Sequence, residues 1–404
     1  MKKTTIKSLV FAVLVGALVT SCQQDEPVIT PDDNAVISTS SQIIPGQYIV
    51  VYNTERTGHS GRLFPGDRES SARFVREKID EIFQSKSLPK PTLIHVFSQT
   101  VNGVTLKLSN RELALLKEDS RIAYIEQDQI ISLGPPKGAA KPGGGTAPQE
   151  TPWGITRVNG ISNYTGSNVA WVLDTGIDLD HSDLNVDVSR SVSFLTSGGP
   201  SAASPDDEHG HGSHVAGTIG ALNNSIGVIG VAPGATVISV RVLNRQGSGT
   251  ISGVIAGVDH VGSHGRGGDV ANMSLGGSAS QALDDAVVAA SANGIKFCLA
   301  AGNESDDANN YSPARANGNN IYTISAMRQG DIWASFSNFG NPPIDYCAPG
   351  VAIKSTWKNG GYNTISGTSM ATPHAAGVLL LGSAKASGKV SADPDGNPDT
   401  IISH

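Results

Sequence analysis

The chain has 404 residues, a formal net charge of −7 and 47 glycines, and aromatic residues make up 5% of it. This length allows two or three domains. The acidic balance and the lack of a basic block exclude an ordinary nucleic-acid-binding surface. No run of eighteen apolar residues follows the N-terminus, so we expect no membrane-spanning helix.

The first 21 residues have the pattern of an export signal. Three lysines precede an apolar core between residues 9 and 19, which is too short to span a membrane comfortably. The core ends in Val19-Thr20-Ser21-Cys22, which resembles the lipobox of bacterial lipoproteins, where the cysteine is lipidated. We expect residues 1–21 to be a lipoprotein-type signal peptide, Cys22 to carry the lipid, and residues 22–45 to be a polar tether. An ordinary signal peptide with a chance cysteine is the alternative.

Residues 46–132 alternate strand and helix patterns in the order β-α-β-β-α-β, which is the order of a split βαβ, or ferredoxin-like, sandwich. Asn110 is expected to cap the second helix. The predicted strands cover residues 48–52, 93–97, 104–108 and 121–126, and the predicted helices lie at residues 71–83 and after Asn110.

Two stretches of this unit carry a family resemblance. Gly46 to Val51 and Ala123 to Asp128 resemble the start and end of the inhibitory propeptide of subtilisin-like serine proteases. In that family the propeptide assists folding, lays its C-terminal tail along the active site and is then cut off. A generic small α/β binding module is the alternative. Residues 133–151, rich in Pro, Gly and Ala, are expected to be an exposed linker that contains the maturation site.

Residues 152–404 alternate apolar strand patterns with helical ones, which predicts a doubly wound, mostly parallel α/β sheet flanked by helices. Active sites in such sheets gather where the strands end. Asp174 directly follows the apolar run 169–173, where an unpaired carboxylate would be costly. It either caps a turn or orients a catalytic histidine.

Ser369 lies in Gly367-Thr368-Ser369, just before an apolar helical run. Pro373 is tolerated only in the first turn of a helix, so Ser369 is expected at a helix N-terminus, where N–H groups favour developing negative charge. A capping Ser/Thr cluster is the alternative. The chain order Asp174, His211, Ser369 is that of subtilisins.

Residues 207–217 supply three histidines. The family motif His-Gly-Thr-His-Val-Ala-Gly places its base at His211, with Ser213 in place of the threonine. His214 is then expected inside a helix with a structural role, and His209 is given no role. A zinc-binding metallohydrolase is the alternative, although no second cluster of ligands follows.

Further segments match the family. Ala301, Gly302 and Asn303 end a strand and resemble its oxyanion segment, which implies that the Asn303 amide and the Ser369 N–H hold the oxyanion. A turn asparagine is the alternative. The segment that resembles the substrate-pairing wall is Ser274, Leu275, Gly276 and Gly277, and Tyr311 to Ala314 resembles a second wall of the same pocket. Residues 335–340 and 348–350 resemble the proteinase K-like branch. The uncharged pocket rim implies an apolar or aromatic P1 preference.

No cofactor is expected for catalysis. Asp345 resembles a calcium ligand of proteinase K-like relatives, together with carbonyls near Asn319 and Ile321, and an aspartate closing a turn is the alternative. Residues 393–399 are acidic and are expected to form a loose tail rather than a weak calcium loop. Cys298 and Cys347 are expected to be buried free thiols, with a disulfide as the alternative.

These expectations together describe a serine endopeptidase made as a self-processed zymogen. It would act on polypeptides, be inhibited by its own propeptide and work as a monomer. We expect export from a bacterial cell, either as an outer-membrane or cell-surface lipoprotein that touches the membrane only through its lipid, or as an enzyme secreted after maturation. A binding protein with an inactive protease fold is a further alternative.

Overall fold

A computed structural model describes residues 39–54, 67–133, 143–144, 147–160, 163–382 and 384–404. The predicted signal peptide, Cys22 and residues 134–142 of the predicted linker lie outside these ranges. Within them, no helix has the length and apolar character needed to cross a membrane.

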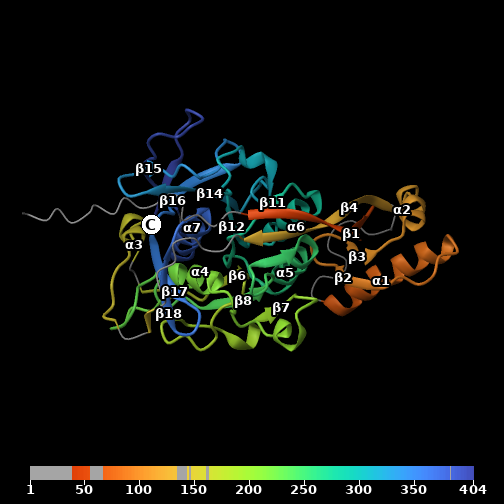
Figure 1. The fold of residues 1–404 in the computed structure, drawn as a ribbon, viewed down its shortest axis with the longest axis horizontal. Helices are drawn as coiled ribbons and strands as arrows, with labels where there is room; N and C mark the ends of the chain where they lie inside the picture. The colour runs from red at the N-terminus through yellow and green to blue at the C-terminus, as the bar shows by residue number, and fades with distance from the viewer. Residues whose placement is uncertain (1–38, 55–66, 134–142, 145–146, 161–162, 383) are drawn as a thin grey trace, which may run out of the picture. The chain divides into compact units, whose positions relative to one another are not determined.

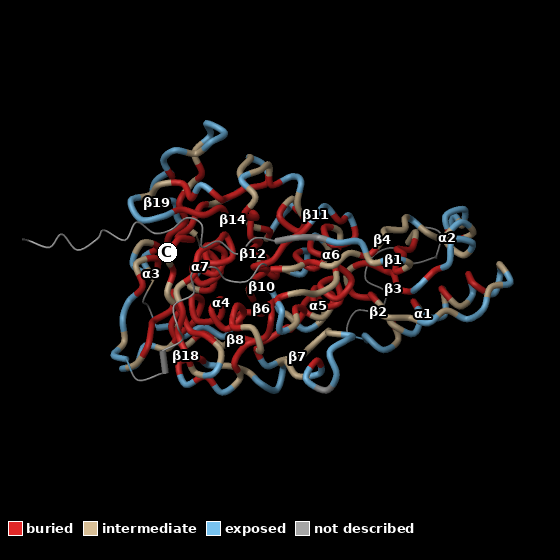
Figure 2. The backbone as a smooth tube through the Cα atoms, viewed as in Figure 1, coloured by how far each residue is buried: buried red, intermediate tan, exposed pale blue. Residues whose placement is uncertain are grey.

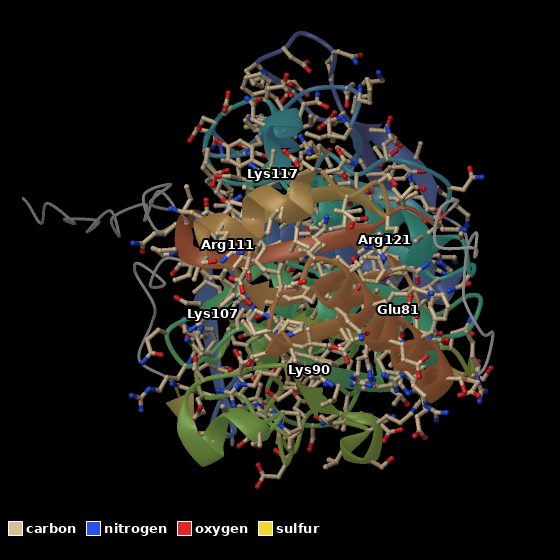
Figure 3. All side chains as sticks on the ribbon, turned by 90° about the vertical axis from the view of Figure 1, so that its right-hand side faces the viewer. Glu81, Lys90, Lys107, Arg111, Lys117 and Arg121 are labelled. Atoms are coloured by element: carbon tan, nitrogen blue, oxygen red, sulfur yellow. The ribbon has the colours of Figure 1, made fainter. Side chains whose placement is uncertain are left out.

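The N-terminal domain is an antiparallel sheet with two helices, as predicted. Its strands pair in the order β2-β3-β1-β4. In chain order the elements are β1 (Thr39–Tyr52), α1 (Arg68–Ser85), β2 (Leu93–Phe97), β3 (Gly103–Lys107), α2 (Asn110–Lys117) and β4 (Ile122–Leu133). One face of α1 buries Val75, Ile79 and Ile82 against the sheet. The side of the domain seen in Figure 3 carries charged side chains such as Lys90, which pairs with Asp80.

The cap of α2 differs from the prediction by one residue. Ser109, not Asn110, is the N-cap, because its hydroxyl accepts the Glu112 N–H while the Glu112 carboxylate accepts the Ser109 N–H. This reciprocal capping box satisfies two amide groups that the first turn leaves without helical partners. Asn110 is therefore the first residue inside the helix.

The C-terminal domain is built on a mostly parallel sheet, which confirms the predicted fold class. In spatial order its strands are β19 (Lys385–Lys389), β20 (Thr400–Ser403), β16 (Ile344–Pro349), β14 (Ile321–Arg328), β12 (Lys296–Ala300), β10 (Val270–Met273), β6 (Ala170–Asp174), β8 (Val237–Arg241) and β7 (Val192–Ser193). β19 pairs antiparallel with β20, and the short β15 (Ile332–Trp333) pairs antiparallel with β14. The central strands β6 and β10 are buried along their whole length (Figure 2), as expected for strands covered on both faces.

Two pairs of helices cover the sheet (Figure 1). α4 (His211–Gly220) packs against α7 (Thr368–Leu381), and α5 (Ile251–His264) packs against α6 (Gln281–Ser291). In Figure 1 the central strands run between the two pairs. The short helix α3 (Trp153–Arg157) precedes the sheet, and a hairpin of β17 (Ile353–Trp357) and β18 (Gly361–Ile365) pairs with β5 (Gly143–Gly144).

The C-terminal segment is not the loose tail that its composition suggested. Residues 393–399 connect β19 to β20, and β20 joins the main sheet beside β16. Asp399 is buried and accepts hydrogen bonds from the Ser325 hydroxyl and the Asn341 amide. The prediction was wrong because β20 is only four residues long and directly follows the acidic turn, so the sequence pattern did not indicate a strand. Cys298 on β12 and Cys347 on β16 are buried free thiols, with β14 between their strands.

Candidate active site

Asp174 and His211 meet directly at the carboxyl end of β6. Asp174 is the last residue of that strand and His211 the first residue of α4. His211 Nδ1–H donates to Asp174 Oδ1 over 2.7 Å, and both side chains are fully buried. The Thr175 N–H donates to the same oxygen. This geometry fixes the imidazole tautomer with a lone pair on Nε2, the atom that must accept a proton in base catalysis.

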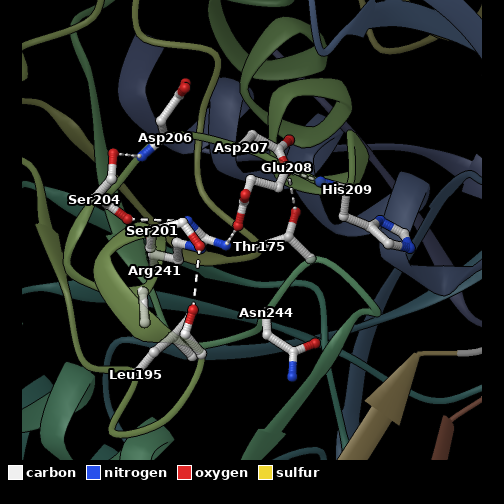
Figure 4. Close-up of polar contacts among 12 residues, drawn as sticks. Thr175, Leu195, Ser201, Ser204, Asp206, Asp207, Glu208, His209, Arg241 and Asn244 are labelled. Atoms are coloured by element: carbon white, nitrogen blue, oxygen red, sulfur yellow. Dashed lines mark hydrogen bonds and ion pairs between the residues drawn. The ribbon is translucent and has the colours of Figure 1, made fainter.

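The loop before α4 is held by Asp207 (Figure 4). One carboxylate oxygen accepts from the Thr175 hydroxyl and from the N–H groups of His209 and Gly210. The other accepts from the N–H and the hydroxyl of Ser213. Asp207 thus ties the turn after Asp174 to the start of the helix that carries His211. Ser213, which stands where the family motif has threonine, supplies the hydroxyl of this bond to Asp207.

Ser369 is the second residue of α7, as its predicted place at a helix N-terminus requires. Pro373 lies deeper than predicted, at the sixth helical position, where it cannot donate to the Ser369 carbonyl. The Ser274 hydroxyl donates to that carbonyl instead, over 2.7 Å. Ser274 therefore repairs the hydrogen bond that the proline removes, which explains why a proline is tolerated inside this helix.

The Ser369 hydroxyl makes no hydrogen bond to His211 in this structure. It donates to the Ser274 carbonyl over 3.0 Å, and His211 Nε2 has no hydrogen-bond partner among the described residues. The structure thus joins Asp174 to His211 and seats Ser369 on the neighbouring helix α7. Loose serine–histidine geometry is common before substrate binds.

Two hydrogen-bond donors lie near Gly367. The Ser369 backbone nitrogen and the Asn303 Nδ2 both lie 3.7 Å from the point where a Cβ of Gly367 would stand, and Asn303 Oδ1 lies 3.6 Å from it. Asn303 Oδ1 accepts the N–H and the hydroxyl of Thr368, which fixes the orientation of the amide. The Gly302 N–H donates to the same hydroxyl, so the strand end at Ala301 and Gly302 is fastened to α7. The geometry fits an oxyanion-binding site.

The other two histidines of the cluster do not share the role of His211. His214 Nε2–H donates to the Ile353 carbonyl, and burial lowers the pKa of His214 to about 3. His214 is therefore a neutral structural residue, as predicted. His209 lies beside the cleft, with its ring centroid 6.4 Å from that of His211, and burial and the nearby His211 lower its pKa.

The two predicted pocket walls lie side by side. β11 (Gly277–Ser278), which follows Leu275 and Gly276, pairs antiparallel with β13 (Tyr311–Ser312). A further short strand was missed from the sequence. β9 (Ser248–Thr250) pairs antiparallel with the end of β4. β9 is only three residues long and contains a glycine, so its sequence does not predict a strand, and it is recognised only by its pairing with β4.

The N-terminal domain contacts the larger one through buried carboxylates. Glu126 accepts the Ala282 N–H at the start of α6, and Asp128 accepts the N–H and hydroxyl of Ser252 at the start of α5. Negative charge at these helix N-termini complements their exposed N–H groups. In the opposite direction, Asp259 on α5 accepts the N–H groups of residues 98–100. The strand β4 thus docks along two helices of the catalytic domain.

At the predicted calcium position, Asp345 is not part of any group of three His, Cys, Asp or Glu side chains among the described residues that could hold a metal ion. Its Oδ2 accepts the Thr323 N–H, and burial raises its pKa to about 6. Within the described ranges, no group of three His, Cys, Asp or Glu side chains is placed to hold a metal ion. Any calcium here would rely on Asp345 and backbone carbonyls.

Comparisons with known proteins point to one family. The sequence profile of the subtilase family matches residues 166–392, and that of peptidase inhibitor I9 matches residues 47–134. Alkaline serine exoprotease A of Vibrio alginolyticus is 40% identical over 369 residues, covering 88% of this chain and 62% of the relative. The chain therefore spans less than two thirds of that relative.

Another relative matches over nearly its whole length. Extracellular serine proteinase of Thermus sp. (strain Rt41A) is 37% identical over 388 residues, covering 91% of this chain and 88% of the relative. A crystal structure of a cold-adapted subtilisin-like serine proteinase superposes with a TM-score of 0.54 at 40% identity, covering 62% of this chain and 97% of the other.

Proposed function

The chain belongs to the subtilase family, and on that premise we propose that it is a serine endopeptidase with Asp174, His211 and Ser369 as its triad. The observation that carries this proposal is the buried Asp174–His211 hydrogen bond at the carboxyl end of β6. The helix that bears Ser369, α7, packs against the helix that bears His211. Asn303 and the Ser369 N–H are proposed as the oxyanion donors. Ser274 to Gly277, with Ala301 and Gly302, are proposed to bind the substrate backbone.

The mechanism follows from these positions. His211 Nε2 takes the proton of Ser369 as its oxygen attacks a peptide carbonyl, and Asp174 stabilises the imidazolium that forms. The negative oxygen enters the space beside Gly367, where each donor contributes about 3–4 kcal/mol of transition-state stabilisation. His211 then gives its proton to the leaving amine, and water hydrolyses the acyl-enzyme by the same route.

The placement of the described side chains disfavours the metallohydrolase alternative, because no group of three His, Cys, Asp or Glu residues among them could hold a metal ion. One nitrogen of each of two histidines is also committed elsewhere, His211 Nδ1 to Asp174 and His214 Nε2 to a backbone carbonyl. The inactive-fold alternative is disfavoured, because the hydrogen bond from His211 Nδ1 to Asp174 leaves a lone pair on Nε2 that can accept a proton.

We also propose that the protein is exported and self-processed. The name of the Thermus relative describes an extracellular enzyme, and the N-terminal pattern of this chain is that of an export signal. Lipidation of Cys22 is proposed from its lipobox-like context, and Cys22-dependent incorporation of a labelled fatty acid would test it. Calcium at Asp345 is proposed from family resemblance alone, and an unchanged melting temperature in EDTA would contradict it.

The decisive experiment compares the chain from Gln23 onward with its Ser369→Ala twin by intact mass and casein hydrolysis. We expect the wild type to fall to a shorter form that cuts casein, while the twin stays whole. If both stay whole and neither cuts casein, the protein is not a self-maturing protease. If both are cut alike, another protease is responsible.

A further inference from the structure

Two strands of the inhibitor domain lie between β9 and β11. The first is the inhibitor tail, residues 129–133 at the end of β4, which pairs with β9 and continues the ladder with the Leu133 N–H donating to the Gly247 carbonyl over 2.8 Å. The second is the N-terminal strand, residues 39–43 at the start of β1, which pairs with the other edge of the tail. Within the described ranges, β4 pairs with no strand besides β1 and β9. The tail is therefore enclosed between β9 and the N-terminal strand.

On its far side, β1 reaches the predicted substrate wall. It contacts β11 (Gly277–Ser278), and in Figure 1 the start of β1, drawn in red, lies next to β11. Among the described strands, β11 itself pairs only with β13. The spatial order is thus β9, inhibitor tail, N-terminal strand and β11.

The wall that leads into β11 is attached to the proposed nucleophile. Ser274 lies just before β11, and its carbonyl accepts a hydrogen bond from the Ser369 hydroxyl. The Ser274 hydroxyl donates in return to the Ser369 carbonyl. A strand that lies against β11 therefore stands where an extended substrate would reach the wall beside Ser369.

The directions of the backbone groups show how the N-terminal strand holds the tail. Successive residues of a strand direct their N–H and C=O groups to opposite edges. Because Leu133 directs its N–H to β9, Ser132 and Ile130 direct theirs to the N-terminal strand. Their partners in the register are Ser40 and Gln42. The peptide groups of these two residues therefore face the tail.

The N-terminal strand is less buried than the tail. In the tail, Ile131 is 0% and Leu133 1% exposed, whereas Ile43 is 57% exposed and Gln42 is exposed as well. Burial of apolar side chains contributes much of the stability of a bound strand. The N-terminal strand should therefore be the first of the two to leave.

We propose that residues 39–43 are a second inhibitory strand, which covers β11 and one edge of the tail until the inhibitor domain is released. This inference rests on the proposed protease function and adds its regulation. While the N-terminal strand is in place, an extended substrate cannot lie against β11. Its departure uncovers this wall and leaves the tail paired on one edge only, so it should control how fast the enzyme becomes active.

The test compares chains that begin at Gln23, at Ser38 and at Ile44. The first two keep the N-terminal strand and the third lacks it. A fourth chain, which begins at Gln23, carries Ser40→Pro/Gln42→Pro, which removes the two N–H groups that face the tail. If the proposed function holds, all four release the same mature enzyme, and their final rates of casein hydrolysis should agree.

The lag before casein hydrolysis is the measured quantity. We expect it to be shorter by about tenfold in the chain from Ile44 and in the proline variant, because hydrogen bonds to one edge of the tail are lost. The chain from Ser38 is the matched control and should keep the lag of the chain from Gln23.

Amide hydrogen exchange in the Ser369→Ala background separates a loosened tail from an unfolded domain. The Ile130 and Ser132 amides should exchange at least about tenfold faster in the chain from Ile44 than in the chain from Ser38. The amides of β3, in the same domain, should keep their rates.

Each other outcome has a distinct meaning. Equal lags in the chains from Ser38 and Ile44 would overturn the proposal, and so would faster exchange throughout β3, because the strand would then only stabilise the domain. If the chain from Ile44 does not fold, the proline variant takes its place in both measurements. If no chain gains the ability to cut casein, the proposed protease function itself fails, and the exchange rates still decide whether residues 39–43 shield the tail.

Discussion

At the scale of single residues, the proposed oxyanion site depends on the missing side chain of Gly367. Its φ of +155° and its missing Cβ leave open the space near Asn303 and the Ser369 N–H. We expect Gly367→Ala to lower kcat by about 100-fold or more, because the methyl group would occupy the place of the oxyanion. KM should change little, since the substrate backbone binds elsewhere.

Steady-state kinetics on a peptide substrate measures this effect. The matched control is Gly382→Ala at the other end of α7, where φ is +143° and nothing lies within 4 Å of the added carbon. This control carries similar backbone strain and should keep its kcat. Equal losses of kcat in both variants would show that strain, not a blocked oxyanion site, is the cause.

At the scale of elements, α7 depends on a hydroxyl from outside the helix. Pro373 leaves the Ser369 carbonyl without a helical donor, and Ser274 supplies one. In a Ser369→Ala background, Ser274→Ala should lower the free energy of unfolding by about 1–3 kcal/mol, the cost of an unsatisfied buried carbonyl. Urea denaturation measures it. The exposed Ser201→Ala control should change stability by less than about 0.5 kcal/mol, and an equally small effect of Ser274→Ala would contradict this account of the helix.

The same helix shows how far the sequence leads. The apolar run after Ser369 predicted a helix with the serine at its start, because capping and proline rules are local. The depth of Pro373 was missed because its compensation comes from Ser274, 99 positions before it in the chain. The short strands β9 and β20 were missed for a related reason, since long-range pairing alone defines them. The proposed triad could be predicted from motif and order, whereas the rotamer of Ser369 and the anchoring role of Asp207 depend on contacts that only the folded chain shows.

At the scale of the whole molecule, two buried neutral histidines should make stability depend on pH. Burial lowers the pKa of His374 to about 4 and that of His214 to about 3, below the value of about 6.5 expected in the unfolded chain. At pH values between the folded and the unfolded pKa, these histidines are protonated in the unfolded chain and neutral in the folded protein. Each histidine therefore contributes stability that is present above pH 6.5 and is lost as pH falls toward its folded pKa.

Buried carboxylates with raised pKa values, such as Asp259, act in the opposite direction over part of this range, so the informative quantity is a difference between variants. In the Ser369→Ala chain, His374→Gln should reduce the slope of unfolding free energy against pH by about 1 kcal/mol per pH unit between pH 4.5 and 6. Urea titrations at several pH values give this slope. The exposed Lys385→Gln control, which changes no group that titrates there, should keep it. A His374→Gln slope equal to that of the parent would mean that folding does not lower the pKa of His374, and that its Nε2, which has no hydrogen-bond partner among the described residues, can hold a proton in the fold.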